Sequence, residues 1–171
     1  MTRTLLLIRH AEAARTPAGG TDRDRPLTDH GVRQAELIGR LVASGVLPAP
    51  ELALCSDALR ARTTWKTAEA AAGLTAVTVI DSSLYSTSYE DVILLLRTVP
   101  DDVQVVAVIG HAPEIPGLAY SFADRRPPEA SSIGWPAAGV GVADYDGPWA
   151  QFPDAARLVH TRHVDAPDPG N

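Results

Sequence analysis

The feature that most constrains the fold of this chain is an uninterrupted apolar run at residues 5–8, which ends at once in Arg9 and His10. Such a run is typical of a parallel strand that is buried on both faces of a sheet. Open α/β sheets bind their ligands in the crevice beyond the carboxyl ends of these strands. His10 is therefore a candidate nucleophile or base, and Arg9 is a planar cation suited to phosphate or carboxylate. Taken alone, the pair also fits a strand end whose polar side chains simply reach solvent.

A second apolar run, at residues 103–109, also leads to a histidine, His111. Its β-branched residues favour a central strand. Two buried strands that each present a histidine at the carboxyl end predict one shared site, with His10 and His111 at the same edge of the sheet. The alternative for His111 is a structural histidine whose hydrogen bonds are satisfied within the fold.

Arg60 lies in the first turn of a helix expected at about residues 58–72, after a strand expected at residues 51–55. The N-terminus is the positive end of the helix dipole, so a cation there is unfavourable unless an anion binds at the same place. We therefore predict that Arg60 contacts an anion. Arg62 lies two residues further along the helix and faces elsewhere, so we expect it to be exposed.

Strands and helices alternate along most of the chain. We expect helices at residues 29–43, 58–72, 89–99 and 115–122, and strands at residues 5–8, 51–55, 76–80, 103–109, 139–145 and 156–162. Candidate N-caps precede the earlier helices: Thr28, then Ser56 or Asp57, then Ser88, which forms a capping box with Asp91. The alternation predicts an α/β fold, a three-layer α/β/α sandwich around a mostly parallel central sheet, with the last two strands near a sheet edge. We expect a single domain over residues 1–164 and a frayed tail over residues 165–171.

Charge and composition narrow the class of protein. The net charge of −6 gives no global attraction to nucleic acid. Lys66 is the only lysine, so an anion site must be built from arginines. Cys55 is the only cysteine, which excludes an intramolecular disulfide and a thiolate metal cluster, and we expect it to be buried. The apolar runs are too short for a signal peptide or a membrane span, which favours a soluble, cytoplasmic protein that does not bind membranes.

Four short motifs follow this pattern of strands and helices. They are Arg9-His10 after the first strand, Pro26-Leu27-Thr28-x-x-Gly31-x-x-Gln34-Ala35 at the first helix, Ser56-x-x-x-Arg60-Ala61-x-x-Thr64 after the second strand, and Gly110-His111-x-Pro113 after the fourth. In this order they resemble the histidine phosphatase superfamily, whose fold is called phosphoglycerate mutase-like. The small size and the Arg9-His10-Ala11-Glu12-Ala13 variant resemble its short bacterial branch, the phosphohistidine phosphatases. The resemblance covers nearly the whole chain.

This resemblance implies a role for each residue of the site. His10 would take the phosphoryl group and form a phosphohistidine intermediate, since a neutral imidazole is a competent nucleophile near neutral pH. Arg9, Arg60 and His111 would surround the transferred oxygens, and Ser56 would add a hydrogen bond. Such a clamp needs no metal, and no cluster in the sequence has metal-ligand spacing, so we expect neither a metal nor a cofactor.

The sequence departs from the family pattern in three places. Ala11 replaces a more common glycine, and Ala112 replaces a polar residue after the second histidine. The larger mutase-type members also carry a proton-donating glutamate in the segment that corresponds to residues 84–87, and this segment contains no acid here. Because the family's usual proton donor is absent, another residue must supply the proton or the leaving group must depart without one.

Three acids remain as candidate proton donors: Glu12, Glu90 and Asp91. We favour Glu12 because it lies two residues from His10. Glu90 and Asp91 fit better as acids that complement a helix dipole. A missing acid favours a substrate whose leaving group departs without protonation by the enzyme, as the ring-protonated imidazole of phosphohistidine does.

The sequence therefore predicts a metal-independent phosphatase whose partner is a phosphorylated substrate, with phosphohistidine proteins as the favoured class. A phosphatase of small phosphomonoesters is the alternative within the same chemistry. A phosphate-recognising binding module without turnover is the alternative from another class. Such a module would tolerate the missing acid, but it would not need His10 as a nucleophile.

Overall fold

The computed structural model describes residues 1–86, 88–123, 135–154 and 156–166. Its strands are β1 (Thr2–Arg9), β2 (Leu52–Ser56), β3 (Val77–Asp81), β4 (Val105–Gly110), β5 (Gly139–Asp146) and β6 (Ala156–His163). Its helices are α1 (Asp29–Ala43), α2 (Leu59–Ala72), α3 (Tyr89–Leu96) and α4 (Glu114–Ser121), joined by the short 3-10 turns η1 (Asp22–Asp24), η2 (Ser82–Tyr85) and η3 (Trp149–Gln151). The predicted alternation of strands and helices is confirmed.

The described strands form one six-stranded sheet in the order β3-β2-β4-β1-β5-β6. β3, β2, β4 and β1 are parallel to one another, whereas β5 is antiparallel to β1 and β6 is antiparallel to β5. The mostly parallel sheet is thus confirmed, and the last two strands lie at one edge as expected. β1 is central, between β4 and β5.

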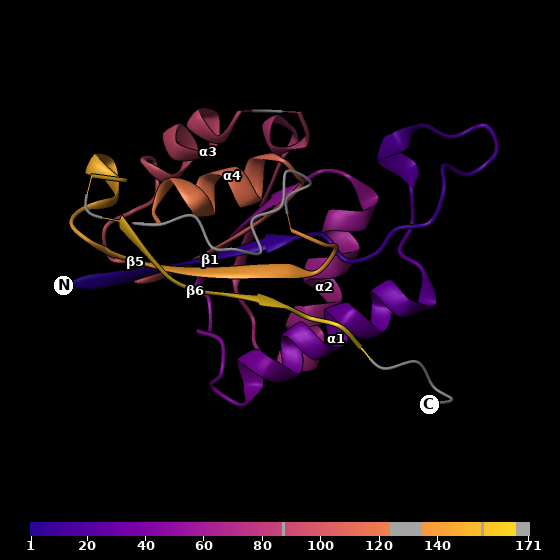
Figure 1. Cartoon of the computed structure of the whole chain (residues 1–171), viewed down its shortest axis with the longest axis horizontal. Coiled ribbons are helices and arrows are strands. Elements are labelled where there is room, and N and C mark those ends of the chain that lie inside the picture. The colour runs from indigo at the N-terminus through magenta and orange to yellow at the C-terminus, as the bar shows by residue number, and fades with distance from the viewer. Residues whose placement is uncertain (87, 124–134, 155, 167–171) are drawn as a thin grey trace.

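Helices cover both faces of the sheet (Figure 1). α1 and α2 lie on one side, and α3 and α4 lie on the other. Alternate residues of β1 serve the two sides, because Leu5 and Leu7 belong to the core under α3 and α4, and Leu6 and Ile8 to the core under α1 and α2. All four side chains are fully buried, and burial of each contributes about 1.5–3 kcal/mol. The apolar run at the start of the chain is therefore the centre of a three-layer sandwich.

The helix starts follow from local capping. Thr28 caps α1, because its Oγ1 accepts a hydrogen bond from the Gly31 amide at 3.0 Å, and the bounds of α1 are those predicted. The capping box of Ser88 and Asp91 at α3 is also confirmed. α3 ends at Leu96, earlier than the sequence predicted, because the chain turns there toward β4.

The predicted cap of α2 is wrong. Its N-cap is Ala58, which makes no side-chain cap hydrogen bond. Ser56 is the last residue of β2, and its hydroxyl is engaged by the His111 ring at 2.8 Å. At the other end, Gly73 adopts a left-handed conformation with a φ of 66° and ends the helix as predicted.

Three further expectations concern burial, membranes and the tail. Cys55 is buried as predicted, and burial raises the pKa of its thiol to about 12. Among the described residues no helix has the length and apolar character needed to cross a membrane. The predicted frayed tail lies mostly outside the described residues, which end at Ala166, and the domain boundary at residue 164 stays a prediction.

Candidate active site

The register of the central strands brings the two predicted histidines together. Arg9 of β1 is the partner of Gly110 of β4, so His10 and His111 follow at the same edge of the sheet. The His10 amide donates a hydrogen bond to the Gly110 carbonyl at 3.0 Å. The centroids of the two imidazole rings are 5.1 Å apart. Both side chains are buried, so neither is a strand end that simply reaches solvent.

His10 is held with one ring nitrogen unprotonated. Its Nδ1 lies 2.8 Å from the Ala11 carbonyl oxygen, and because a carbonyl only accepts, Nδ1 carries the proton. Nε2 is then unprotonated, and it accepts a hydrogen bond from Nε of Arg60 at 3.2 Å. Burial lowers the pKa of His10 to about 4, against the opposing hydrogen bond to Ala11, and the charge of Arg60 lowers it further. The imidazole is therefore neutral near pH 7.

His111 is bound on both sides of its ring. Its Nε2 lies 2.8 Å from the hydroxyl oxygen of Ser56, and its Nδ1 lies 3.4 Å from Nη2 of Arg60. Burial is the largest cause that lowers the pKa of His111 to about 3, followed by the charges of His10 and Arg60. Ser56 is fully buried. The predicted site residue Ser56 therefore contacts His111 directly, and this contact sets the orientation of the ring.

Arg60 presents one edge of its guanidinium to both histidines. Nε and Nη2 form this side edge, with Nε toward His10 and Nη2 toward His111. The start of α2 is fixed by Thr64, whose hydroxyl donates to the Arg60 carbonyl at 2.7 Å and accepts from the Ala11 amide at 3.0 Å. Arg60 is buried and Arg62 is exposed, as predicted from the helix geometry.

Arg9 is the last residue of β1. Its Nη1 donates a hydrogen bond to the Trp135 carbonyl, and its buried Nε has no hydrogen-bond partner among the described residues. Burial lowers the pKa of Arg9, which still leaves an arginine charged. In the part of the chain that the structure describes, this cation is held by one neutral carbonyl, which leaves it donors to offer to an anion.

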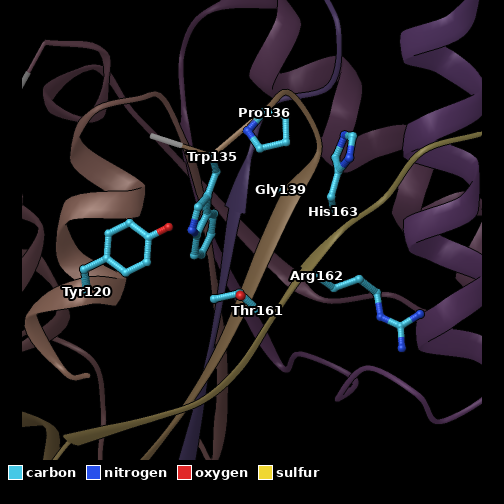
Figure 2. Close-up of a pocket in the computed structure, with 7 residues that line it drawn as sticks. All are labelled: Tyr120, Trp135, Pro136, Gly139, Thr161, Arg162 and His163. Atoms are coloured by element: carbon cyan, nitrogen blue, oxygen red, sulfur yellow. The ribbon is translucent and has the colours of Figure 1, made fainter. Parts of the chain in front are cut away.

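A cavity of about 290 Å³ adjoins Arg9 through Trp135. It lies between α4, the chain before β5, and β6, and it is lined by Tyr120, Trp135, Pro136, Gly139, Thr161, Arg162 and His163. Figure 2 shows the indole ring of Trp135 with Tyr120 on one side and the side chains of β6 on the other. The ring centroids of Tyr120 and Trp135 are 6.2 Å apart, edge to face. The cavity therefore has aromatic walls and the cationic side chain of Arg162, and the contact between Trp135 and Arg9 links it to the site.

The candidate proton donor Glu12 is engaged by the start of α1. Its Oε1 accepts a hydrogen bond from the Thr28 hydroxyl at 2.7 Å, and its amide donates to Oε1 of Gln34 at 2.9 Å. A Cβ at Gly31 would come within 2.0 Å of the Glu12 carbonyl, so only glycine allows this approach. The Pro-Leu-Thr motif thus anchors the segment that follows His10. The side chain of Glu12 is exposed.

The other candidate acids lie at the start of α3. Asp91 is part of the capping box with Ser88, and Glu90 is exposed in the first turn. A hydrogen bond from its own backbone amide lowers the pKa of Glu90. Both acids thus sit where negative charge complements the helix dipole, as expected from the sequence.

Asp22 and Tyr85 also belong to the site, and sequence reasoning missed both. The end edge of Arg60, formed by Nη1 and Nη2, binds the Asp22 carbonyl at 2.7 Å and its Oδ2 at 3.0 Å. Tyr85 donates its hydroxyl hydrogen to the same Oδ2 at 2.7 Å, and the edge of its ring faces His111 with centroids 5.6 Å apart. The only sequence signal was the charged run of residues 22–25 in the loop after His10.

Comparison with known proteins identifies the family. The model of the histidine phosphatase superfamily (branch 1) matches residues 5–91, which include three of the four motifs. An uncharacterized protein of Mycobacterium tuberculosis is 36% identical over 158 residues, which cover 89% of this chain and 96% of that protein. The chain belongs to the histidine phosphatase superfamily. The resemblance carried by its motifs is confirmed.

Solved structures of this superfamily share the fold. A candidate phosphohistidine phosphatase SixA from Nakamurella multipartitia is 32% identical with a TM-score of 0.81, over 96% of this chain and 97% of that one. A candidate SixA from Agrobacterium tumefaciens is 26% identical with a TM-score of 0.77, over 94% and 97% of the two chains. A protein histidine phosphatase SixA in complex with tungstate, at 19% identity, has a TM-score of 0.76 over 94% and 97%. The phosphoglycerate mutase-like fold expected from the motifs is therefore confirmed.

As a member of this superfamily the chain is a histidine-nucleophile phosphatase. The arrangement supplies a neutral imidazole nitrogen next to two guanidinium groups and a second histidine, which is the chemistry that phosphoryl transfer needs. Among the described residues, no group of three or more His, Cys, Asp or Glu side chains is placed to hold a metal ion.

Proposed function

We propose that this phosphatase hydrolyses phosphohistidine in proteins through a phosphohistidine intermediate on His10, without a metal. The observation that carries the proposal is the unprotonated Nε2 of His10, which lies 3.2 Å from Nε of Arg60. The nucleophilic lone pair of His10 and the phosphate-binding guanidinium of Arg60 are thus in direct contact. Arg60 would release Nε2 when a phosphoryl group arrives, and its side edge would bind the phosphoryl oxygens instead.

In the first step, Nε2 of His10 attacks phosphorus in line with the leaving group. The bond from phosphorus to the substrate nitrogen breaks as the bond from phosphorus to Nε2 forms. Arg9 and Arg60 neutralise the equatorial oxygens. The negative charge of the bound phosphoryl group favours the protonated form of His111, which is held by Ser56 at 2.8 Å and then donates a further hydrogen bond. The hydrogen bond from Nδ1 to the Ala11 carbonyl, at 2.8 Å, stabilises the positive charge that develops on the His10 ring.

In the second step, water attacks the phosphoryl group on His10. The bond from phosphorus to Nε2 breaks, its electron pair returns to the ring, and the phosphate leaves with both protons of the water, as dihydrogen phosphate. His10 is then neutral again, as its lowered pKa of about 4 favours. Because its pKa is low, the imidazole of His10 is also a good leaving group in this step. The attacking water therefore needs little help from a general base.

The contacts of the acidic residues support phosphohistidine as the substrate. The carboxylate of Glu12 accepts a hydrogen bond from Thr28, and hydrogen bonding from Tyr85 is the largest cause that lowers the pKa of Asp22 to about 2. An acid with that pKa is ionised near neutral pH and donates no proton. We propose that leaving groups depart unaided, which suits the ring-protonated imidazole of phosphohistidine. The 32% identical relative, a candidate phosphohistidine phosphatase, supports the same substrate class.

The cavity beside Arg9 favours a second candidate, a small phosphomonoester. Its volume of about 290 Å³ and its aromatic walls suit a compact leaving group. An aryl alcohol would be a sufficient leaving group without an acid, whereas a sugar alcohol would not. A substrate panel separates the two candidates.

The experiment is phosphate release from a phosphohistidine peptide and from p-nitrophenyl phosphate, each with and without a chelator. We expect turnover of both substrates, a higher kcat/KM for the peptide, and no effect of the chelator. A higher kcat/KM for small aryl phosphates would favour the second candidate. Binding without release of phosphate would mean a recognition module, and activity that vanished with the chelator and returned with magnesium would contradict the mechanism.

A further inference from the structure

We infer that Asp22 is a positioning residue, which binds the end edge of the Arg60 guanidinium and so turns its side edge toward the phosphoryl group on His10. The inference rests on the proposed function, since it takes Arg60 as a phosphate-binding residue. It adds a residue from the loop between β1 and α1 to a site otherwise built at strand ends and the start of α2.

The guanidinium of Arg60 is fixed in its plane by two acceptors from one residue. The Asp22 carbonyl accepts from Nη1 at 2.7 Å, and its carboxylate accepts from Nη2 at 3.0 Å. Paired contacts along one edge hold both the plane and the rotation of an arginine head group. The hydrogens of the adjacent side edge, on Nε and Nη2, then point at His10 and His111. With alanine at position 22, Arg60 would keep its charge and its bond to the backbone carbonyl, but it would lose the acceptor of Nη2 and with it the paired contact that fixes this direction.

Asp22 is itself held by further donors. Tyr85 donates to its Oδ2 at 2.7 Å, and Arg25 contacts its Oδ1 at 3.2 Å. The guanidinium of Arg23 lies 4.1 Å from the centroid of the Tyr85 ring. Although the side chain of Asp22 is 48% exposed, these hydrogen bonds restrict its carboxylate to one orientation. A residue that positions Arg60 must be restricted in this way.

The same geometry excludes two other roles for Asp22. It is no proton donor, since hydrogen bonding from Tyr85, Arg25 and Arg60 keeps its pKa near 2. It does not occupy the place of the phosphoryl group either. It takes the end edge of Arg60, whereas the side edge is the one that faces His10.

The kinetic test compares Asp22→Ala with Asp22→Asn. We expect kcat of the alanine variant to fall roughly ten- to a hundredfold, because a misdirected catalytic group loses about that much, while KM changes less than about threefold because the charge of Arg60 remains. Asp22→Asn restores part of kcat, since its amide oxygen still accepts from Nη2. Tyr85→Phe should lower kcat by a smaller factor in the same direction. Glu36→Gln is the matched control, because it removes an exposed carboxylate from a pair with Arg40 on α1.

A double-mutant cycle tests whether Asp22 acts through Arg60. In an Arg60→Ala background, Asp22→Ala should change kcat/KM less than about twofold. Equal losses in both backgrounds would overturn the inference. So would an alanine variant with unchanged or higher kcat and tighter inhibition by inorganic phosphate, because Asp22 would then be a competing anion.

A measurement that needs no turnover separates this inference from the proposed function. In wild-type protein, NMR should resolve the Nη hydrogens of Arg60, because contacts with Asp22 slow rotation of the head group. Asp22→Ala should merge these signals, and Glu36→Gln should not. Merged signals in the wild type would overturn the inference even if the enzyme is active, whereas resolved signals without phosphate release would overturn only the proposed function.

Discussion

Different forces hold two parts of the site. One part is the pair of histidines, and the other is an outer layer that consists of Asp22, Arg25 and Tyr85. His10 and His111 follow the paired residues Arg9 and Gly110 of adjacent parallel strands, and the sheet beneath them is closely packed. The outer layer is fixed by hydrogen bonds between partly exposed polar side chains.

This difference separates two properties of the site. The sheet fixes where the histidines are, because moving either one would disrupt a buried ladder. The outer layer fixes how Arg60 is turned, and polar contacts at a surface are weaker and more easily changed. Substitutions in the two regions should therefore differ in the size and kind of their effects.

The largest effect is expected from the proposed nucleophile, His10, which directly follows strand β1. His10→Ala should lower turnover at least about 10³-fold, in the range seen when a nucleophile is removed. The fold should be retained, because the hydrogen bonds of this side chain within the described residues are to its neighbour Ala11 and to Arg60. Trapping with labelled substrate should give an acid-labile, base-stable phosphoenzyme in the wild type alone. Label on the His10→Ala protein would refute the assignment.

Arg60 contacts both the histidines and Asp22 of the outer layer. Its removal should therefore cause the second largest loss of activity. Hydrogen bonds to charged groups contribute about 1.5–3 kcal/mol each, so Arg60→Ala should lower kcat/KM roughly ten- to a hundredfold or more. Arg62→Ala, two residues away and exposed, is the control and should change it less than about twofold. Similar losses in the two variants would show that general positive charge matters and not the position of Arg60.

Substrates with different leaving groups test whether an acid near the outer layer protonates the leaving group. If none does, kcat should depend steeply on leaving-group pKa, with aryl phosphates and phosphohistidine faster than alkyl phosphates by roughly 10²–10⁴. Glu12→Gln should then slow no substrate, because its carboxylate serves Thr28. The measurement is a series of substrates of graded pKa at one pH. A flat dependence in the wild type, or selective slowing of alkyl substrates in Glu12→Gln, would identify an acid.

The free energy of unfolding should depend on pH differently for the histidines and for the outer layer. This effect is expected to be smaller than those of the substitutions above. The pKa of His111 falls to about 3 and that of His10 to about 4 on folding, from about 6.5 in the unfolded chain. The unfolded state therefore binds more protons in this window, and the free energy of unfolding decreases as pH falls from about 6.5 toward 4. The lowered pKa of Asp22, about 2, acts only at lower pH, where its stabilisation is lost as the carboxylate protonates.

Thermal unfolding at pH 7, 6, 5 and 4.5 checks this separation. Tm of the wild type should fall by several degrees across the series, and His111→Asn should fall less because it lacks one of the buried imidazoles. Asp22→Asn should follow the wild-type slope. A wild-type Tm that stayed constant, or a slope changed by Asp22→Asn, would contradict the assignment of the two windows.

Local pattern predicted the elements that carry the catalytic groups. The apolar runs identified β1 and β4 together with the histidines beyond them, and the expected bounds of α1 are those of the structure. Dipole and periodicity arguments separated buried Arg60 from exposed Arg62. These features could be predicted because periodicity and capping depend on residues that are only a few positions apart in the sequence.

The tertiary structure alone decided the strand order, the partner of Ser56 and the membership of Asp22 and Tyr85 in the site. Asp22 contacts Arg60 across 38 residues and Tyr85 across 63, and Ser56 contacts His111 across 55. Nothing in the local sequence encodes which polar group another will meet after the chain has crossed the sheet several times. A cap for α2 was predicted from Ser56 or Asp57 because a short polar side chain before a helix usually caps it. In the folded protein β2 and β4 are neighbours, so the Ser56 hydroxyl lies 2.8 Å from the His111 ring, and its bond to the backbone before α2 is the longer one, at 3.3 Å from the Ala58 amide.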